Sequence, residues 1–210
     1  MAYTRYVRED ELACLARLAE EWKVPLSPEI TRRVIEFCRL LIAWNVRVNL
    51  TGARTVAEVV GEHVVDAFAM ARLVPPGSSV VDVGAGGGLP GVVFAILRPD
   101  AQLTMVEPRA KRVAFLRTAV RESRLESTAV FHGRADALDP GGFDVAASRA
   151  TFPPGEWLSV GQSLVRAGGL VLVFAGDAWS PEHSSLRAVN ELRYETASGK
   201  GLWIGAFCST

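Results

Sequence analysis

The sequence predicts an α/β fold in which a mostly parallel sheet ends in an antiparallel hairpin and carries an N-terminal helical cap. From Ser79 onward, short apolar runs alternate with helical stretches, which is typical of a parallel sheet with covering helices. The last two apolar runs are separated only by residues 198–201, a hairpin-length connection. The chain has 210 residues, 49% of them hydrophobic, which suits one such domain and not two large ones.

The first part of the chain is predicted to be helical. Apolar residues recur at spacings of three and four in two stretches: Leu12, Leu15, Leu18 and Trp22, then Ile30, Val34, Phe37, Leu41 and Trp44. Ser27 is expected to cap the second helix, with Pro28 at its first position. A third helix is predicted over residues 56–73. We expect residues 1–77 to form a helical cap within the same domain as a core of residues 78–210.

The core is predicted to contain seven strands. Five belong to the parallel part of the sheet, over residues 79–83, 102–107, 128–132, 143–147 and 169–174. Helices are expected between them over residues 90–97, 110–123 and 156–165. The remaining strands, over residues 192–197 and 202–208, form the terminal hairpin.

The most informative segment is residues 80–91, which read V-V-D-V-G-A-G-G-G-L-P-G. An apolar strand runs directly into glycines that can adopt positive φ and let the backbone approach a ligand closely, namely Gly84, Gly86 and Gly88. Glu107 ends the second strand, where a carboxylate can accept hydrogen bonds from both hydroxyls of a ribose. These features predict a nucleotide-type cofactor site, although a glycine-rich structural turn is the alternative.

Two cofactors fit this spacing. Gly86, Gly88 and Gly91 satisfy the G-x-G-x-x-G pattern of NAD sites. However, Asp82 would repel a pyrophosphate, whereas it can hold a cationic amino-acid group directly or through water. S-adenosylmethionine has such a group and no phosphate. The terminal hairpin also matches the Rossmann-like class I S-adenosylmethionine-dependent methyltransferase order, whereas a dinucleotide fold would require another crossover helix. S-adenosylmethionine is therefore favoured, with NAD as the alternative.

Composition limits the location and the partners. Cys14, Cys38 and Cys208 show no C-x-x-C spacing, so neither a metal site nor a disulfide framework is predicted, and a reduced, cytoplasmic compartment fits. No apolar run is long enough to span a membrane. The 23 basic and 23 acidic residues cancel, so nucleic-acid binding would require a local basic patch.

Such a patch is predicted in and just before the helix over residues 110–123. Six basic residues fall within sixteen positions: Arg109, Lys111, Arg112, Arg117, Arg121 and Arg124. A patch of this kind suits RNA binding, and a solvated helix face is the alternative interpretation.

Several motifs together resemble one known family. They are Asn49-Leu50-Thr51, His63 with Asp66, the glycine run ending in Gly-Leu-Pro-Gly, Lys111-Arg112-Val113 with Phe115-Leu116-Arg117, and Ser148-Arg149-Ala150. Over residues 44–150 the chain resembles the RsmG family, also called glucose-inhibited division protein B. Its members methylate N7 of a guanosine in the 16S ribosomal RNA of the bacterial small subunit, using S-adenosylmethionine.

The resemblance implies roles for particular residues. Gly84 and Leu89 would line the S-adenosylmethionine site and Glu107 would bind the ribose. Ala135 and Asp136 would flank the adenine, and Arg149 would close the site from the fourth strand. Substrate-side candidates, without an assigned catalytic role, are Asn49, His63, Asp66 and Arg149. Methylation of N7 releases no proton from the base, so no general base is expected.

Two departures from the family pattern leave alternatives open. Glu62 stands where an arginine usually precedes the histidine, and Ala175 stands where a lysine usually ends the fifth strand. Both remove positive charge from the expected RNA side. A non-catalytic or altered-substrate RNA-binding relative, a small-molecule methyltransferase and an NAD-dependent oxidoreductase are therefore the competing hypotheses.

Overall fold

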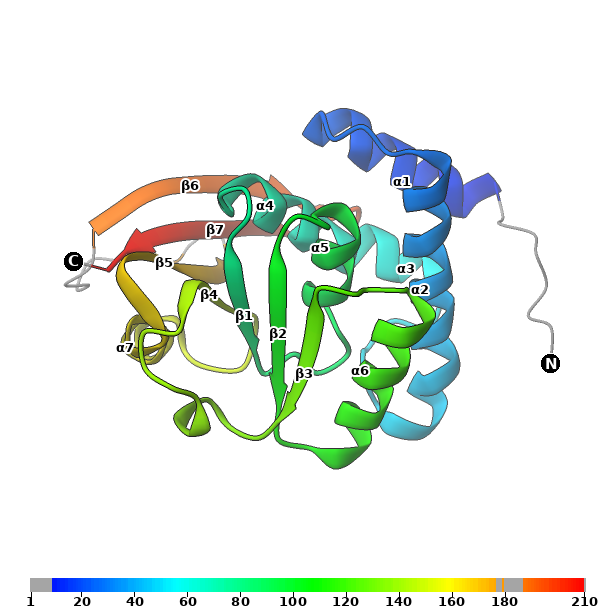
Figure 1. The fold of residues 1–210 in the computed structure, drawn as a ribbon. Helices are drawn as coiled ribbons and strands as arrows, with labels where there is room; N and C mark the ends of the chain where they lie inside the picture. The colour runs from blue at the N-terminus through cyan, green and yellow to red at the C-terminus, as the bar shows by residue number, and fades with distance from the viewer. Residues whose placement is uncertain (1–8, 177–178, 180–186, 210) are drawn as a thin grey trace.

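A seven-stranded sheet with the strand order β3-β2-β1-β4-β5-β7-β6 forms the centre of the computed structural model, which describes residues 9–176, 179 and 187–209 (Figure 1). The strands are β1 (Ser79–Val83), β2 (Gln102–Glu107), β3 (Thr128–His132), β4 (Phe143–Ser148), β5 (Val165–Gly176), β6 (Arg187–Glu195) and β7 (Gly201–Cys208). Strands β1 to β5 are parallel, and β7 runs antiparallel to both of its neighbours. The predicted parallel sheet with a terminal antiparallel hairpin is confirmed.

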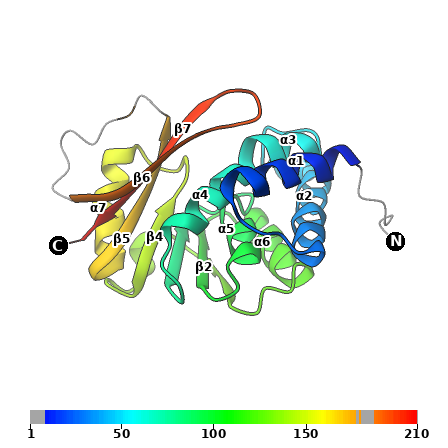
Figure 2. The ribbon, with the colours of Figure 1, turned by 90° about the horizontal axis from the view of Figure 1, so that it is seen from above.

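Helices cover both faces of the sheet unequally. They are α1 (Glu9–Trp22), α2 (Pro28–Val48), α3 (Val56–Val59), the π-helical turn η1 (Val60–Val64), α4 (Val65–Leu73), α5 (Gly91–Leu97), α6 (Ala110–Glu122) and α7 (Pro154–Leu164). Figure 2 shows α7 on one side of the sheet and α2, α5 and α6 on the other. The cap helices therefore thicken one layer of the fold.

The alternation of side chains along each strand separates two parts of the core. Val80 faces the layer that contains the cap, whereas Val81 faces α7. On the α7 side, Trp157 is buried and its Nε1–H donates to the Leu172 carbonyl oxygen at 2.8 Å. Both faces of the central strand β1 are thus buried, as its continuous apolar sequence predicts.

The cap packs directly on the core. On α2, Phe37 lies with its ring centroid 6.4 Å from that of Phe115 on α6, and Trp44 lies 5.6 Å from the same ring. As predicted, the Ser27 side chain caps α2 by accepting a hydrogen bond from the Ile30 amide, and Pro28 begins the helix. The Arg33 guanidinium also donates to the Ser123 carbonyl oxygen at the end of α6, at 2.7 Å.

Two strands differ from the prediction by more than one residue at an end. Strand β5 begins at Val165 and not at position 169, because Phe143 pairs with Val165 before a register shift on β4. Strand β6 spans Arg187–Glu195 and not residues 192–197, since it pairs with β7 along its whole length. Polar residues on this edge strand hide its start in the sequence, and such residues are common on exposed edges.

The predicted helix over residues 56–73 is interrupted. The π-helical turn η1 lies within it and carries Glu62 and His63. Gly61 contacts the turn between β6 and β7, where its carbonyl oxygen accepts a hydrogen bond from the Ala197 amide at 2.9 Å. A Cβ at Gly61 would lie 2.8 Å from the Ala197 Cβ. Helix α2 also continues beyond the expected end near Trp44, to Val48.

None of the helices in the described part of the chain combines the length and apolar character needed to cross a membrane.

Replacing Phe37 by alanine tests whether the cap and core unfold together. We expect a loss of about 3–5 kcal/mol in unfolding free energy, because Phe37 is fully buried between the layers. Val46→Ala on the same helix is the control, since Val46 is 86% exposed, and should change stability by about 0.5 kcal/mol or less. Denaturant unfolding followed by fluorescence and circular dichroism should give one coincident transition. A separate early transition in Phe37→Ala, with the main transition unchanged, would mean that the cap is an independent unit.

Candidate functional site

The candidate site lies at the carboxyl ends of the parallel strands, the edge where open α/β sheets bind ligands. A cavity of about 410 Å³ opens there between the segments that follow β1, β2, β3 and β4. Its lining residues are Val83, Gly84, Val106, Pro108, Gly133, Arg134, Ala135, Asp136, Thr151, Phe152, Glu156 and Val160. Of the residues predicted for the cofactor, Gly84, Ala135 and Asp136 are part of this lining.

The glycine loop after β1 has the predicted backbone conformation. Gly84, Gly86 and Gly88 have φ values of +76°, +54° and +73°. A Cβ at Gly84 would overlap the Thr151 side chain, which lies over the loop. The loop is fixed to the neighbouring strand because the Gly84 amide donates to the Val106 carbonyl oxygen at 2.8 Å. Only a residue without a Cβ lets the Thr151 side chain pack against the loop at this point.

Asp82 lies within β1, beneath the glycine loop, and not in the turn itself. Its side chain is 1% exposed, and its Oδ2 has no hydrogen-bond partner among the described residues. Burial raises the pKa of Asp82 to about 7, which the positive charge of Arg149 partly opposes. A Cβ on Gly91 would approach Asp82 Oδ2 to 2.5 Å, so this glycine leaves room for the acid.

Glu107 connects β2 to the glycine loop. Its Oε2 accepts from the Gly86 amide at 3.1 Å, and its Oε1 accepts from the Arg109 amide at 2.9 Å. The side chain is buried, and Arg112 Nη1 lies 3.9 Å from Oε2. A carboxylate has about four acceptor positions, and backbone amides use two of them here.

The segment after β3 supplies the far side of the cavity. Ala135 and Asp136 begin the short 3₁₀ helix η2 (Ala135–Ala137), and the exposed Asp136 carboxylate lies 3.6 Å from Arg134 Nε. Leu89 lies elsewhere: it is half-buried, packs against the cap-side core and is not part of the cavity lining.

Three of the four substrate-side candidates meet at Arg149. The Arg149 guanidinium forms an ion pair with Asp66 through Nε, and its Nη2 lies 3.1 Å from His63 Nδ1. The other ring nitrogen of His63 lies 3.2 Å from Thr51 Oγ1. The Tyr194 hydroxyl, from β6, donates to Asp66 Oδ1 at 2.5 Å. A continuous chain of polar contacts therefore links β6, α4, the end of β4, η1 and the loop after α2.

The ionisable groups in this series of polar contacts have shifted pKa values because of burial and of neighbouring charges. Asp66 is 1% exposed, and burial raises its pKa, although Arg149 and the Tyr194 hydroxyl oppose the shift. Burial also lowers the pKa of His63, and the positive charge of Arg149 acts in the same direction. The arrangement thus favours a neutral imidazole beside a charged arginine.

The loop after α2 is organised by Asn45, which the sequence did not single out. Its Oδ1 accepts from the Leu50 and Thr51 amides at 2.6 and 2.9 Å, and its Nδ2 donates to the Thr51 and Ala53 carbonyl oxygens at 2.8 and 3.2 Å. Asn49 ends α2 in the left-handed conformation with φ +55°, and its side chain is exposed. Asn49 has no hydrogen bond to the Arg149 chain among the described residues.

The two departures from the family pattern have different surroundings. Glu62 faces the β6–β7 turn, where its two carboxylate oxygens accept from the Ser198 amide and hydroxyl, each at 2.9 Å. It therefore anchors the hairpin. Ala175 is paired with Trp203 on β7 and packs against the α7-side core.

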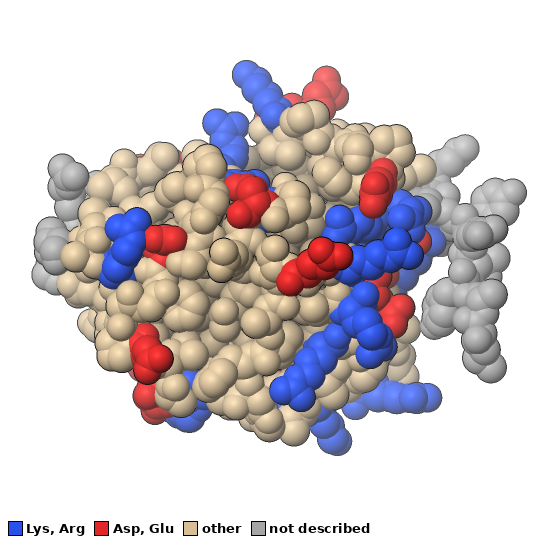
Figure 3. Space-filling model, in the orientation of Figure 1, with Lys and Arg blue, Asp and Glu red and all other residues tan. Residues whose placement is uncertain are grey.

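The basic residues in and around α6 divide into two groups. Lys111, Arg117 and Arg121 are exposed on the helix, and Figure 3 shows Lys and Arg side chains gathering over the side of the molecule where α6 and α2 lie. Arg112 differs because it is half-buried beside Glu107. A Cβ on Gly86 would lie 3.6 Å from Arg112 Nη1. Arg112 thus belongs to the surroundings of the glycine loop.

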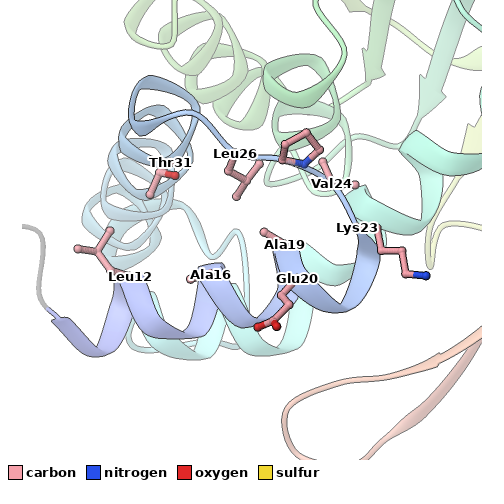
Figure 4. Close-up of a pocket in the computed structure, with 9 residues that line it drawn as sticks. Leu12, Ala16, Ala19, Glu20, Lys23, Val24, Leu26 and Thr31 are labelled. Atoms are coloured by element: carbon pink, nitrogen blue, oxygen red, sulfur yellow. The ribbon is translucent and has the colours of Figure 1, made fainter.

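A second cavity, of about 510 Å³, lies between α1 and the segment leading into α2 (Figure 4). Its lining is mainly aliphatic, from residues such as Leu12, Ala16 and Leu26, and includes none of the predicted site residues. It contributes nothing to the arrangement at the sheet edge.

Comparison with known sequences gives a consistent result. Residues 30–199 match the family model described as GidB, rRNA small subunit methyltransferase G. A protein named ribosomal RNA small subunit methyltransferase G from Chlorobaculum tepidum is 30% identical over 83% of this chain and 81% of its own length. A protein of the same name from Xanthomonas euvesicatoria pv. vesicatoria is 38% identical over 68% of each chain.

Solved structures support the fold. A putative O-methyltransferase from Klebsiella pneumoniae superposes with a TM-score of 0.62 at 17% identity, covering 94% of this chain and 97% of that one. An S-adenosylmethionine-dependent methyltransferase from Aquifex aeolicus gives 0.57 at 14% identity, covering 73% and 93%. The chain therefore has the class I methyltransferase fold that its strand order predicts.

The buried Asp82 makes stability depend on pH. Burial raises the pKa of Asp82 from an ordinary value of 3.8 to about 7. The free energy of unfolding should therefore fall as pH rises between these two values, because the unfolded chain loses the proton more readily than the folded protein does. Asp82→Asn should therefore gain stability relative to the wild type by about 4 kcal/mol between pH 4 and pH 8. Denaturant unfolding across this range measures the difference, with the exposed Asp139→Asn as control. A difference that is constant with pH would contradict the raised pKa.

Proposed function

The chain belongs to the rRNA small subunit methyltransferase G family and is an S-adenosylmethionine-dependent methyltransferase, and we propose that it methylates N7 of a guanosine in bacterial 16S ribosomal RNA. The observation that carries the proposal is the pairing of two half-sites at one sheet edge. The glycine loop with Glu107 lies on one side, and the chain from Arg149 to Thr51 lies on the other. Both lie within the matched residues 30–199.

The residues present fit S-adenosylmethionine. Gly84 lines the cavity with positive φ beside Thr151, and the buried Glu107 carboxylate accepts only two hydrogen bonds from backbone amides, out of about four acceptor positions. We assign the ribose to Glu107, the adenine to the Ala135–Asp136 segment, and closure of the site to Arg149. When bound, the cofactor supplies a methyl group already activated on a positively charged sulfur.

The task of the protein is then to position the base, since methylation of N7 removes no proton. Placing N7 about 3 Å from the methyl carbon, in line with the breaking bond, is catalysis by proximity and orientation. His63 agrees with this mechanism. Its Nδ1 faces Arg149 and its Nε2 faces Thr51, so both ring nitrogens are held in hydrogen bonds. His63 therefore orients its neighbours and is not placed as a general base.

We further propose that exposed residues around α6 contact RNA phosphates, namely Arg109, Lys111, Arg117, Arg121 and Arg124. Their positive charges gather on one side of an otherwise neutral chain, and phosphate neutralisation is a major part of RNA affinity. Because N7 lies on the major-groove edge, which is inaccessible in A-form RNA, the target guanosine should lie in an open structure. With ribosomal RNA as its substrate, we expect the protein to act in the cytoplasm.

An altered-substrate relative is the second candidate, suggested by Glu62 and Ala175. Two observations weaken it. Glu62 points toward Ser198 and not toward the Arg149 chain, and Lys200 in the same turn adds positive charge beside His63 and Asp66. The loss of an arginine at position 62 is therefore partly compensated locally.

Methyl transfer to ribosomal particles tests the proposal. The purified protein, incubated with radiolabelled S-adenosylmethionine and small subunits from cells lacking the gene, should label 16S RNA. Mass spectrometry of the nucleosides should identify N7-methylguanosine. A different methylated nucleoside would point to an altered substrate, and no label with intact cofactor binding would contradict the activity.

Glu107→Ala tests the cofactor half of the site. Loss of the carboxylate removes the acceptors for the ribose and leaves the Gly86 amide unpaired. S-adenosylmethionine binding measured by calorimetry should weaken by about 1–3 kcal/mol. Glu126→Ala, an exposed acid after α6, should bind as the wild type does. Equal affinity in both variants would remove the assignment.

The double variant Lys111→Ala, Arg117→Ala tests the basic surface. Each lost phosphate contact lowers the slope of log affinity against log salt by about 0.7–0.9, so the slope should fall by about 1.5. Cofactor affinity should not change. Arg17→Ala, on the exposed surface of α1, is the control. An unaltered slope would mean that Lys111 and Arg117 lie on a solvated helix face and do not contact RNA.

A further inference from the structure

The direction of each hydrogen bond between Arg149 and Thr51 is fixed by chemistry. A guanidinium donates and cannot accept, so His63 Nδ1, 3.1 Å from Arg149 Nη2, is the acceptor. A neutral imidazole with an accepting Nδ1 carries its hydrogen on Nε2. His63 Nε2 must therefore donate to Thr51 Oγ1, which lies 3.2 Å away. The burial that lowers the pKa of His63 agrees with this neutral tautomer.

Thr51 Oγ1 also receives a second hydrogen bond. The Ala53 amide donates to it at 3.2 Å. A hydroxyl has two acceptor lone pairs and one hydrogen, so both lone pairs are now occupied. The hydroxyl hydrogen has no acceptor among the described residues. Thr51 is half-buried, and its hydroxyl can act only as a donor toward whatever enters the site.

The loop that carries Thr51 lies against the cofactor loop. A Cβ on Gly87 would lie 3.0 Å from the Leu50 carbonyl oxygen and 3.4 Å from the Leu50 Cβ. Asn45 holds Leu50 and Thr51 in place through their amides. Leu50 thus packs against the glycine loop, and Thr51 next to it holds the unpaired donor beside His63.

We propose that the Thr51 hydroxyl donates a hydrogen bond to O6 of the target guanine and so selects guanine over adenine. This inference rests on the proposed methylation of guanine N7. Guanine presents N7 and O6 as two acceptors on one edge, whereas adenine presents an amino donor beside N7. A donor-only hydroxyl matches the first pattern and leaves the adenine amino group without an acceptor.

Two residues on the far side of Arg149 from His63 act as positioning residues, namely Asp66 and Tyr194. Asp66 holds Arg149 through the ion pair, and the Tyr194 hydroxyl holds Asp66 from β6 at 2.5 Å. Neither contacts Thr51 directly. Their effect on recognition passes through the orientation of Arg149, which fixes the tautomer of His63.

An exchange of the substrate base tests the assignment. Small subunits are reconstituted with 16S RNA that carries either guanine or 2-aminopurine, which retains N7 and lacks O6, at the target position. The ratio of kcat/KM for the two substrates is measured for the wild type, Thr51→Val and Thr51→Ser. The wild type and Thr51→Ser should prefer guanine by about tenfold, the order expected for one hydrogen bond, and Thr51→Val should show almost no preference.

A general structural role for Thr51 would lower the rates on both substrates equally and leave the ratio unchanged. An unchanged ratio in Thr51→Val, or no preference in the wild type, would overturn the proposal. If Thr51→Val does not bind S-adenosylmethionine, Thr51→Cys replaces it, because a thiol is a weak donor, and the same criterion applies. Failure of the wild type to methylate guanine subunits would reject the proposed function itself.

Discussion

The ion pair between Arg149 and Asp66 is the interaction on which the site depends. Asp66 lies in the helical layer with 1% of its surface exposed, and Arg149 follows β4 at the sheet edge. A buried carboxylate that loses its partner is strongly destabilising, so Arg149 is held beside Asp66. The ion pair thereby joins the helical layer to the sheet edge. Arg149 then contacts His63, and His63 contacts Thr51. In the proposed site, the position of one guanidinium thus determines how the Thr51 side faces the glycine loop.

The terminal hairpin supports the same site from outside the parallel sheet. Tyr194 on β6 reaches the buried Asp66, and Ser198 in the following turn binds Glu62 on the π-helical turn. Such turns occur frequently at functional sites. In this fold, the π-helical turn carries His63. The hairpin that completes the sheet therefore also fixes the segment that presents the histidine.

Periodicity and local motifs predicted the sheet, the cap and the positive φ values of Gly84, Gly86 and Gly88, because each depends on residues close together in sequence. Tyr194 could not be found in this way, since it meets Asp66 across 128 positions. Asn45 carries no motif of its own, and its hydrogen bonds to Leu50, Thr51 and Ala53 depend on how the chain turns back after Val48. Arg112 shares its sequence run with exposed arginines, and only packing beside Glu107 separates it from them.

A double-mutant cycle between Asp66→Asn and Thr51→Val tests most directly whether the ion pair determines the substrate side. The quantity measured is kcat/KM for methyl transfer to small subunits at saturating S-adenosylmethionine. If Asp66 acts through Arg149 and His63 on Thr51, the double variant should lose no more activity than the worse single variant. Losses that multiply would mean that the two residues act independently, and would contradict the account.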